Sequence, residues 1–399
     1  MSYELYSRCL WPHYLQSHEY SIITHNSSLL PPAANVRKFL LFASPKPFPV
    51  HSPHITLKDD LLHTGYNCDH LPLSATSIGM KIISHPVFLD HDNGTHPENR
   101  KRLLAFGELP AEPLLLDGEA YLDLVHPRSY IEMVRTHCQN SLDLDGDTVV
   151  CPGSFKAATC AVGATIMAME RGDFALVRPP GHHAFAEESH GFCLFNNVAV
   201  AAQLAASKGK KVLILDFDGH LGDGTMDIFY NSDQVLYWSM HQYPAYPGNG
   251  AAHEIGAGKG KGFTFNVPLP AGSGDDILLH SVEYMLPAAE HFNPDVVAIS
   301  AGFDAHQFDP LLQLRASGHF YYKVGKLLAQ TFRDKLFGVL EGGYDTEELP
   351  KLVHNFIAGI NGEPMPHHEA GTSSGMRIWE TYELHLHLAA SYLNKYWRF

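Results

Sequence analysis

The sequence predicts an α/β protein in which a mostly parallel sheet is flanked by helices on both faces. Two observations carry this prediction: short runs that are apolar throughout recur along the chain, and helical patterns separate them. Strands that are apolar on both faces are typical of a parallel sheet covered by helices on both sides. A third observation is that metal-capable polar residues follow these runs, and ligands of such sheets bind outside the carboxyl ends of the strands.

The predicted strands are the apolar runs Phe174–Val177, Val212–Phe217, Val235–Ser239, Phe263–Val267, Val296–Ser300 and Phe337–Leu340. The predicted helices are Phe195–Ala206, Ile277–His291, His319–Phe332 and Glu347–Ile360. Residues 1–78 differ, since Pro-interrupted stretches and weak periodicity predict an N-terminal extension of unknown role. A cleaner pattern begins at Met80, so the main domain is predicted over residues 79–399.

The charge of the chain restricts its partners. With 28 basic and 43 acidic residues among 399, the formal net charge is −15. Direct binding to nucleic acid is therefore not expected, because phosphate contacts require a basic surface. An acidic surface attracts cationic substrates such as polyamines or basic peptides, and it is equally compatible with ordinary solubility.

Cysteine usage and hydropathy restrict the compartment. The six cysteines form no C-x-x-C pair, so neither a disulfide scaffold nor a thiolate zinc site is predicted. There is no run of 18 apolar residues and no apparent secretory signal, so no membrane association is expected. We expect a cytoplasmic protein, with export to another compartment left open.

The run ending in Asp216 is followed by Asp218 and His220, an alternating pattern. In extended chain, alternate side chains point the same way, so these three side chains share one face just past a strand. Two carboxylates and one imidazole suit zinc or a similar divalent ion, and Asp304 after a later strand is the candidate for a further ligand. The alternative is that the strand-end carboxylates only cap the next helix.

His182 and His183 stand in a Pro/Gly loop, Arg-Pro-Pro-Gly-His-His-Ala. As a general base and acid, such histidines need orienting carboxylates, and Asp216 and Asp223 are available. The alternative is an ordinary surface loop. Tyr344, which follows a strand and two glycines, is a candidate donor to a developing oxyanion, or else part of a simple turn.

Taken in order, these motifs resemble the histone deacetylase superfamily, which also holds acetylpolyamine amidohydrolases. The match runs from about His85 to the 360s. Its pieces are His96-Pro97-Glu98 with Arg102 and Leu103, then Arg178–Ala184, Gly191–Ala199, Leu215–Thr225, His241-Gln242 through Gly248, Ser300–Ala305 and Glu341–Asp345. The resemblance implies an arginase-like fold, a mostly parallel sheet with helices on both faces.

The resemblance also implies two metal sites. One Zn²⁺ would be held by Asp218, His220 and Asp304. A structural K⁺ or Na⁺ would be held by the side chains of Asp216 and Ser239 and by backbone oxygens of Asp218, His220 and Met240.

The resemblance further assigns the reacting and lining residues. The histidine pair would be His182, oriented by Asp216, and His183, oriented by Asp223, with Tyr344 polarising the acyl carbonyl. The substrate channel would be lined by Gly191, Phe192, Tyr246, Leu311, Gly342 and Gly343, with Arg102 below its floor and Asp145 as a candidate rim residue. The implied reaction is zinc-dependent hydrolysis of the amide of acetyl-lysine or a related acyl-lysine.

The chain departs from the family pattern near this site. The family usually has a branched residue where Gly219 stands and a second histidine where Leu221 stands. After Asp309-Pro310 it commonly continues Leu-Gly-Gly, whereas this chain reads Leu311-Leu312-Gln313.

Leu311 falls at a position where an acidic residue marks polyamine specialists among the eukaryotic members of the family. A leucine offers nothing to a second ammonium group, so acyl-lysine in a protein or peptide is favoured over an acetylated polyamine, which stays the alternative substrate. The oligomeric state stays open.

The motifs fit two other classes of protein less well. Asp216-Phe217-Asp218 also resembles the start of aspartyl-phosphate phosphotransferases, but His220 stands where those require Thr or Val. A non-catalytic acyl-lysine-binding pseudo-enzyme is motivated by Gly219 and Leu221, although every implied ligand, both histidines and the tyrosine are present.

Overall fold

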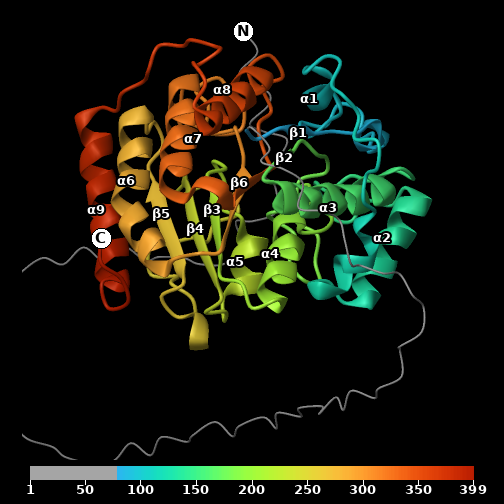
Figure 1. Ribbon diagram of the computed structural model, residues 1–399, viewed down its shortest axis with the longest axis horizontal. Coiled ribbons are helices and arrows are strands. Elements are labelled where there is room, and N and C mark those ends of the chain that lie inside the picture. The colour runs from blue at the N-terminus through green and yellow to red at the C-terminus, as the bar shows by residue number, and fades with distance from the viewer. Residues whose placement is uncertain (1–78) are drawn as a thin grey trace, which may run out of the picture. The chain divides into compact units, whose positions relative to one another are not determined.

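The computed structural model describes residues 79–399, and the extension predicted over 1–78 lies outside the described residues. Within them, one sheet has the strand order β1-β2-β7-β6-β3-β4-β5, and every neighbouring pair is parallel (Figure 1). Its strands are β1 (Ile82–Ile83), β2 (Phe174–Ala175), β3 (Val212–Asp216), β4 (Val235–Gln242), β5 (Thr264–Leu269), β6 (Val296–Ala301) and β7 (Leu336–Leu340). The predicted fold class is confirmed.

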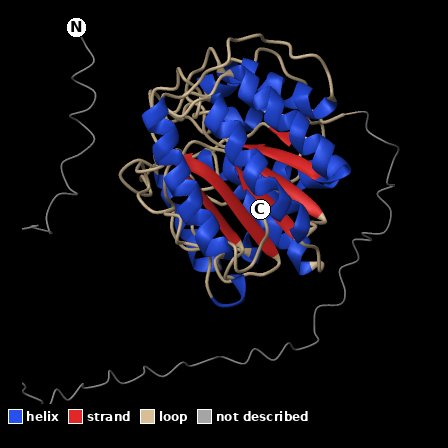
Figure 2. Cartoon of the chain, turned by 90° about the vertical axis from the view of Figure 1, so that its left-hand side faces the viewer, coloured by secondary structure: helices blue, strands red, loops and turns tan. Residues whose placement is uncertain are grey.

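Helices cover both sides of this sheet. They are α1 (Lys101–Leu104), α2 (Arg128–Asn140), α3 (Ser154–Arg171), α4 (Asn197–Ser207), α5 (Asp223–Phe229), α6 (Asp275–Phe292), α7 (Gly318–Phe332), α8 (Leu349–Asn361) and α9 (Met376–Leu393). In Figure 1, α6 and α7 lie to one side of the strands, α3 and α4 lie to the other, and α9 is outermost beside α6. Figure 2 shows the strands enclosed between helices.

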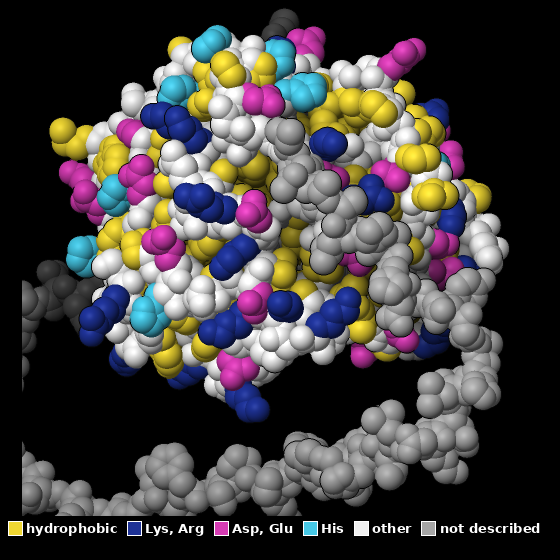
Figure 3. All heavy atoms as spheres, in the orientation of Figure 1, with side chains coloured by type: hydrophobic (Ala, Val, Ile, Leu, Met, Phe, Trp, Pro, Cys, Tyr) yellow, Lys and Arg dark blue, Asp and Glu magenta, His cyan; other side chains and the backbone are white. Residues whose placement is uncertain are grey.

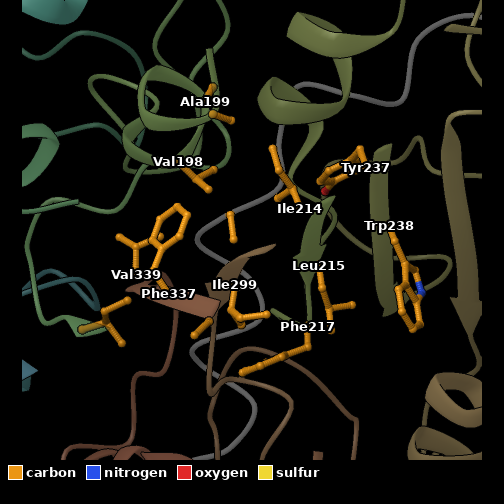
Figure 4. Close-up of a cluster of buried hydrophobic side chains, with 14 of the residues drawn as sticks. Val198, Ala199, Ile214, Leu215, Phe217, Tyr237, Trp238, Ile299, Phe337 and Val339 are labelled. Atoms are coloured by element: carbon orange, nitrogen blue, oxygen red, sulfur yellow. The ribbon is translucent and has the colours of Figure 1, made fainter. Parts of the chain in front are cut away.

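The centre of the sheet is apolar on both faces. All residues of β3 are buried, and β3 pairs with β6 on one side and β4 on the other. Figure 4 shows Ile214 and Tyr237 on one side of the sheet and Leu215 and Trp238 on the other, as the pleat requires. Burial on both faces explains why the sequence of β3 is a continuous apolar run.

The observed elements differ from the predicted ones mainly at their ends. The helix predicted from Phe195 begins at Asn197, because the side chain of Asn196 accepts a hydrogen bond from the Ala199 N–H at 3.0 Å and caps the helix. The strand predicted over Phe174–Val177 is paired in the sheet only over Phe174–Ala175.

Sequence periodicity did not predict α2, α3, α5 or α9. In α3, nearly every residue from Ser154 to Ala168 is buried, so no polar face marks the helix period. In α9, Leu384, Leu388 and Tyr392 are exposed while Leu386 and Leu393 are buried, so apolar residues occupy both faces. In these two helices, α3 and α9, the pattern that identifies an amphipathic helix is therefore obscured.

The structure bears on two predictions made from composition, the one about membrane spans and the one about a basic surface. Within residues 79–399, no helix combines the length and hydropathy that crossing a bilayer requires. On the face shown in Figure 3, basic and acidic side chains are interspersed rather than gathered into one basic patch.

Candidate active site

The predicted metal ligands and reacting residues lie together at the carboxyl edge of the sheet. Asp216 ends β3, Asp304 follows β6, and Tyr344 follows β7. These strands are parallel neighbours, so their carboxyl ends open at the same edge. His182 and His183 lie in the loop after β2, the strand that pairs with the other side of β7.

Asp218, His220 and Asp304 form the candidate metal centre. All three residues are buried, and their ligand atoms lie within 4.8 Å of one another. His220 Nδ1 is 2.7 Å from Asp304 Oδ2 and 3.3 Å from Asp218 Oδ1. Two carboxylates and one imidazole are a donor set that suits Zn²⁺ and leaves a position for water.

Backbone N–H groups hold the outer oxygens of both carboxylates. Gly342 N donates to Asp218 Oδ2 at 2.8 Å, and Gly219 N donates to Asp304 Oδ1 at 2.6 Å. The other oxygens, Asp304 Oδ2 and Asp218 Oδ1, face His220 Nδ1, and Asp218 Oδ1 also accepts from His220 N at 2.9 Å. Such outer contacts orient metal ligands. Position 342 must be glycine, because a Cβ there would lie 2.4 Å from Asp304 Oδ2.

The charges of the triad require a cation between the carboxylates. Burial lowers the pKa of His220, but the neighbouring carboxylates of Asp304 and Asp218 raise that pKa to about 10. Burial and Asp218 raise the pKa of Asp304 to about 6. Two buried carboxylates in contact need a positive charge, which either a protonated His220 or a metal ion supplies. The residues present therefore fit a divalent cation.

The two histidines each contact one carboxylate, and their ring centroids are 4.1 Å apart. His182 Nδ1 is 3.1 Å from Asp216 Oδ2, and His183 Nδ1 is 2.6 Å from Asp223 Oδ1. Burial, assisted by His182 and opposed by Asp223, lowers the pKa of His183 to about 4. Burial also lowers the pKa of His182, but Asp218 and Asp216 raise it well above its usual value. His182 therefore favours its protonated form and His183 its neutral form.

Glu341 supports the histidine loop, although sequence reasoning gave it no role. Its Oε2 accepts hydrogen bonds from Gly181 N at 2.7 Å and His182 N at 3.1 Å, and its Oε1 accepts from Ser300 Oγ at 3.1 Å. Burial raises its pKa to about 7. The available signal was a charged residue that directly follows an otherwise apolar strand.

A buried network of Glu98, Arg102 and Arg178 lies beneath the tyrosine loop. Arg102 donates to Glu98 Oε1 at 3.0 Å, and Arg178 donates to Glu98 Oε2 at 2.7 Å. Burial raises the pKa of Glu98, but Arg178 holds it well below its usual value. Arg102 also donates to the Gly343 carbonyl at 2.6 Å, and its guanidinium carbon is 5.0 Å from the centre of the Tyr344 ring. Arg102 therefore fixes the loop that carries Tyr344.

Tyr344 is held from its backbone side by Asp309, a residue that sequence reasoning did not assign. Tyr344 N donates to Asp309 Oδ2 at 2.7 Å, and Leu311 N donates to Asp309 Oδ1 at 3.0 Å. Burial raises the pKa of the Tyr344 hydroxyl well above its usual value, although Arg102 opposes the shift. The hydroxyl is therefore a proton-bearing donor at neutral pH.

Aromatic rings stand around the metal-ligand triad and the histidine pair. The Phe192 ring is 5.9 Å from that of Tyr344 and 4.5 Å from that of His96. The Tyr246 ring is 5.3 Å from that of His183. Phe192 has a φ of 72°, a left-handed conformation that non-glycine residues rarely adopt and that is typical of functional loops.

The remaining predicted lining residues lie on nearby loops. Leu311 is half-buried next to Asp309, which anchors Tyr344. Asp145 binds its own loop: Oδ1 accepts from Thr148 N at 2.7 Å and Oδ2 from Thr148 Oγ1 at 2.8 Å. Thr148 Oγ1 in turn accepts from Phe192 N at 3.2 Å, so the Asp145 loop is joined to the aromatic wall.

The residues predicted for a monovalent cation lie on the paired strands β3 and β4. Asp216 and Ser239 are opposite each other in the register. Ser239 Oγ is 2.9 Å from His241 Nδ1, and Asp216 Oδ2 accepts from the Tyr237 hydroxyl at 3.0 Å. Met240 follows Ser239 in β4 and is buried.

Comparison with known proteins gives consistent matches. The model of the histone deacetylase domain matches residues 96–360. A "Probable deacetylase" of Archaeoglobus fulgidus is 36% identical over 308 residues, which cover 70% of this chain and 86% of that protein. "Histone deacetylase 10, chloroplastic" of Oryza sativa subsp. japonica is 36% identical over 321 residues, which cover 69% of this chain and 72% of the relative.

A solved structure also matches. The structure titled "Crystal Structure of HDA15 HD domain" aligns with a TM-score of 0.72 and 31% sequence identity, over 80% of this chain and 97% of that one. The fold is thus α/β with the arginase-like arrangement. The chain belongs to the histone deacetylase family, and its relatives support a deacetylase function.

Proposed function

We propose that this chain is a zinc-dependent amidohydrolase that releases acetate, or a related carboxylate, from acyl-lysine in proteins or peptides. The observation that carries the proposal is the meeting, at one edge of the sheet, of the Asp218, His220 and Asp304 triad with two His–Asp pairs. Metal ligands and proton carriers are the two components that amide hydrolysis at neutral pH requires.

Asp218, His220 and Asp304 would hold the zinc ion, since their donor set and their uncompensated negative charge fit it. When bound, zinc supplies Lewis acidity that polarises an acyl carbonyl and acidifies water. The side chains of Asp216 and Ser239, with backbone oxygens of Asp218, His220 and Met240, would hold a K⁺ or Na⁺ ion that stabilises the loop after β3.

His183 acts as the general base. Its Nδ1 is held by Asp223 at 2.6 Å, which fixes the ring and leaves Nε2 to accept the proton of the attacking water. A pKa of about 4 keeps this ring neutral at pH 7, so its lone pair is available. His182, held in its protonated form by Asp216 and Asp218, then delivers a proton to the leaving amine.

Tyr344 stabilises the oxyanion. Its hydroxyl keeps its proton at neutral pH, and its loop is fixed by Arg102 from below and by Asp309 from the side. A donor that is positioned before the reaction needs no reorganisation as charge develops on the substrate oxygen.

The lining favours the aliphatic arm of a lysine. Phe192 and Tyr246 form apolar walls near the reacting groups, and Gly191, Gly342 and Gly343 allow the backbone to approach the substrate closely. Leu311 offers no charge to a second ammonium, which favours acyl-lysine over an acetylated polyamine. The polyamine is the second candidate, because a net charge of −15 attracts any polycation.

A non-catalytic acyl-lysine binder is the rival of another class. The departure at Leu221 supports it only weakly, because that side chain is fully buried and therefore serves the core. The cytoplasmic location stays a prediction, and plant relatives with chloroplastic names set a different expectation for the compartment.

The test is hydrolysis of a fluorogenic acetyl-lysine peptide and of an acetylated polyamine, each with and without a zinc chelator. We expect chelator-sensitive turnover of the peptide that Asp304→Asn abolishes and that Asp334→Asn, at an exposed site in the turn before β7, leaves intact. Turnover of the polyamine alone would overturn the substrate class and keep the chemistry. Zinc binding without turnover of either substrate, or of longer acyl groups, would favour the binder.

A further inference from the structure

His190 is a third histidine beside the candidate pair, and the mechanism above does not use it. Its backbone is fixed by a bridge to Cys193, whose N–H donates to the His190 carbonyl at 2.9 Å. The His190 ring is 6.0 Å from that of His183 and 5.1 Å from that of Tyr246. Its side chain is 31% exposed, whereas that of Asp223 is 3% exposed. His190 therefore links the buried site to its solvent-facing rim.

Asp223 lies between two histidines. Its Oδ1 is 2.6 Å from His183 Nδ1, and its Oδ2 is 2.9 Å from His190 Nδ1. The first contact has hydrogen-bond geometry, but the second does not. His190 Nδ1 is buried and has no hydrogen-bond partner among residues 79–399. A buried ring nitrogen thus faces a carboxylate without a hydrogen bond, which costs free energy unless another ligand engages it.

These three residues have the composition and spacing of a metal site. Their ligand atoms lie within 4.8 Å of one another. Zn²⁺ with bonds of about 2.0–2.1 Å in a tetrahedron places its ligands about 3.3 Å apart. The two contacts of 2.6 Å and 2.9 Å would need to lengthen by about 0.7 Å and 0.4 Å to reach this spacing. We propose that His183, His190 and Asp223 form a second zinc site, distinct from the triad described above, and that zinc bound there inhibits the protein.

The surrounding charge favours a cation at this site. Asp145 and Asp147 on the neighbouring loop act on His190 together with Asp223, and they raise its pKa against the effect of burial. Within the described part of the chain, no lysine or arginine forms an ion pair with any of these three carboxylates. A cation in this largely buried, acidic region is attracted strongly.

Inhibition follows from the shared nitrogen, and this consequence rests on the proposed function. Zinc bound at His183 Nδ1 uses the lone pair of this nitrogen in place of the proton that it shares with Asp223, and the neutral ring then carries its proton on Nε2. Nε2 is the atom that would accept the proton of the attacking water, so a ring protonated there cannot act as a general base. Binding itself does not depend on the proposed activity.

The direct test counts zinc in the full chain by equilibrium dialysis with metal analysis. Wild type should bind two equivalents, and His190→Phe, which keeps a planar ring without nitrogens, should bind one. His190→Ala serves as a second variant if the larger ring perturbs folding. His96→Ala, which removes an imidazole that meets the Phe192 ring edge-on but belongs to neither site, should still bind two. One equivalent in wild type, or two in the His190 variants, would overturn the proposal.

The activity test measures the rate of each protein as free zinc is raised and compares it with the rate of the same protein at one equivalent of zinc. The free zinc concentration that halves the wild-type rate should rise by more than about tenfold in His190→Phe, as for loss of a ligand. Equal inhibition of both proteins would refute the inhibitory role. Tyr344→Phe should lose turnover yet bind two equivalents. No turnover in wild type loaded with one equivalent of zinc, although the protein binds two equivalents at saturation, would contradict the proposed activity while the second site stands.

Discussion

Leu312 occupies the space that a side chain at position 219 would need, because a Cβ on Gly219 would lie 2.3 Å from Leu312 Cδ1. The same Cβ would lie 3.1 Å from Oδ1 of Asp304, a candidate metal ligand. The family usually has a branched residue at position 219 and a glycine at position 312. Two departures that look independent in the sequence therefore compensate each other, with apolar volume moved from one loop to the other.

This compensation predicts coupled mutations. Gly219→Val should destabilise the protein by about 1–3 kcal/mol through overpacking, and Leu312→Gly should cost about 2 kcal/mol through a cavity. The double variant should be more stable than the sum predicts, with a coupling of about 1 kcal/mol or more. Denaturant unfolding measures all three. Gly375→Val, where a Cβ meets nothing within 4 Å, is the control, and strict additivity would contradict the compensation.

Removal of zinc should lower the thermal stability. Without the metal, the carboxylates of Asp218 and Asp304 rely on a protonated His220 for their counter-charge. Ligand binding to the folded state stabilises it by about 2.7 kcal/mol when free zinc is a hundred times its Kd. Chelation should therefore lower Tm, and one equivalent of zinc should restore it. Asp304→Asn should show a smaller response, because only the proposed second site remains intact, and an equal shift in that variant would place the stabilising zinc elsewhere.

Tyr344→Phe should lower kcat by about 10²–10³-fold, the usual loss for one oxyanion donor. Because the hydroxyl is not a metal ligand, zinc content should stay unchanged. Steady-state kinetics with parallel metal analysis measures both. Tyr322→Phe is the matched control, since that exposed hydroxyl only donates to the Glu363 carbonyl. A rise in KM with unchanged kcat would show that Tyr344 binds substrate rather than the transition state.

His126 should make the protein sensitive to acid. It is fully buried, and burial lowers its pKa to about 4. Its Nε2 accepts from Asn196 N at 3.0 Å, so the ring must be neutral there. The unfolded chain binds a proton near pH 6.5 and the folded protein only near pH 4, so stability falls as the pH drops through this window. The loss from this group amounts to about 3 kcal/mol.

His126→Gln tests this assignment, because an amide can bond similarly without titrating. The slope of unfolding free energy against pH between 6.5 and 4 should decrease by up to one proton relative to wild type. Urea unfolding at several pH values measures the slope. Parallel curves for the two proteins would mean that His126 does not contribute.

Leu311→Glu should shift the substrate preference toward acetylated polyamines. The new carboxylate would pair with a second ammonium that the leucine leaves without a partner. We expect the ratio of kcat/KM for polyamine over peptide to rise about tenfold, which is about 1.4 kcal/mol. Leu311→Gln separates charge from size. An unchanged ratio in Leu311→Glu would show that the side chain does not face the substrate.

Sequence reasoning reached the site only where local geometry decides it. Asp216, Asp218 and His220 alternate along extended chain, so their side chains point the same way. They stand at the end of an apolar run that was predicted to be a strand. Asp304 lies more than 80 residues from its partners in the chain, so it could only be proposed as a candidate from its place after a later parallel strand, and the family resemblance then implied its role as a ligand. His190, Glu341 and Asp309 were not assigned, since each acts on a loop that is distant in sequence.

The sequence by itself determined that this chain forms a parallel α/β sheet with chemistry at its carboxyl edge, because apolar periodicity and strand-end residues are local properties. Only the tertiary structure decided which loops meet there. Asp223 reaches both His183 and His190, and Leu312 fills the space above Gly219, because the strand register brings together loops far apart in sequence. Such contacts depend on distances of a few tenths of an ångström, and no spacing along the chain encodes them.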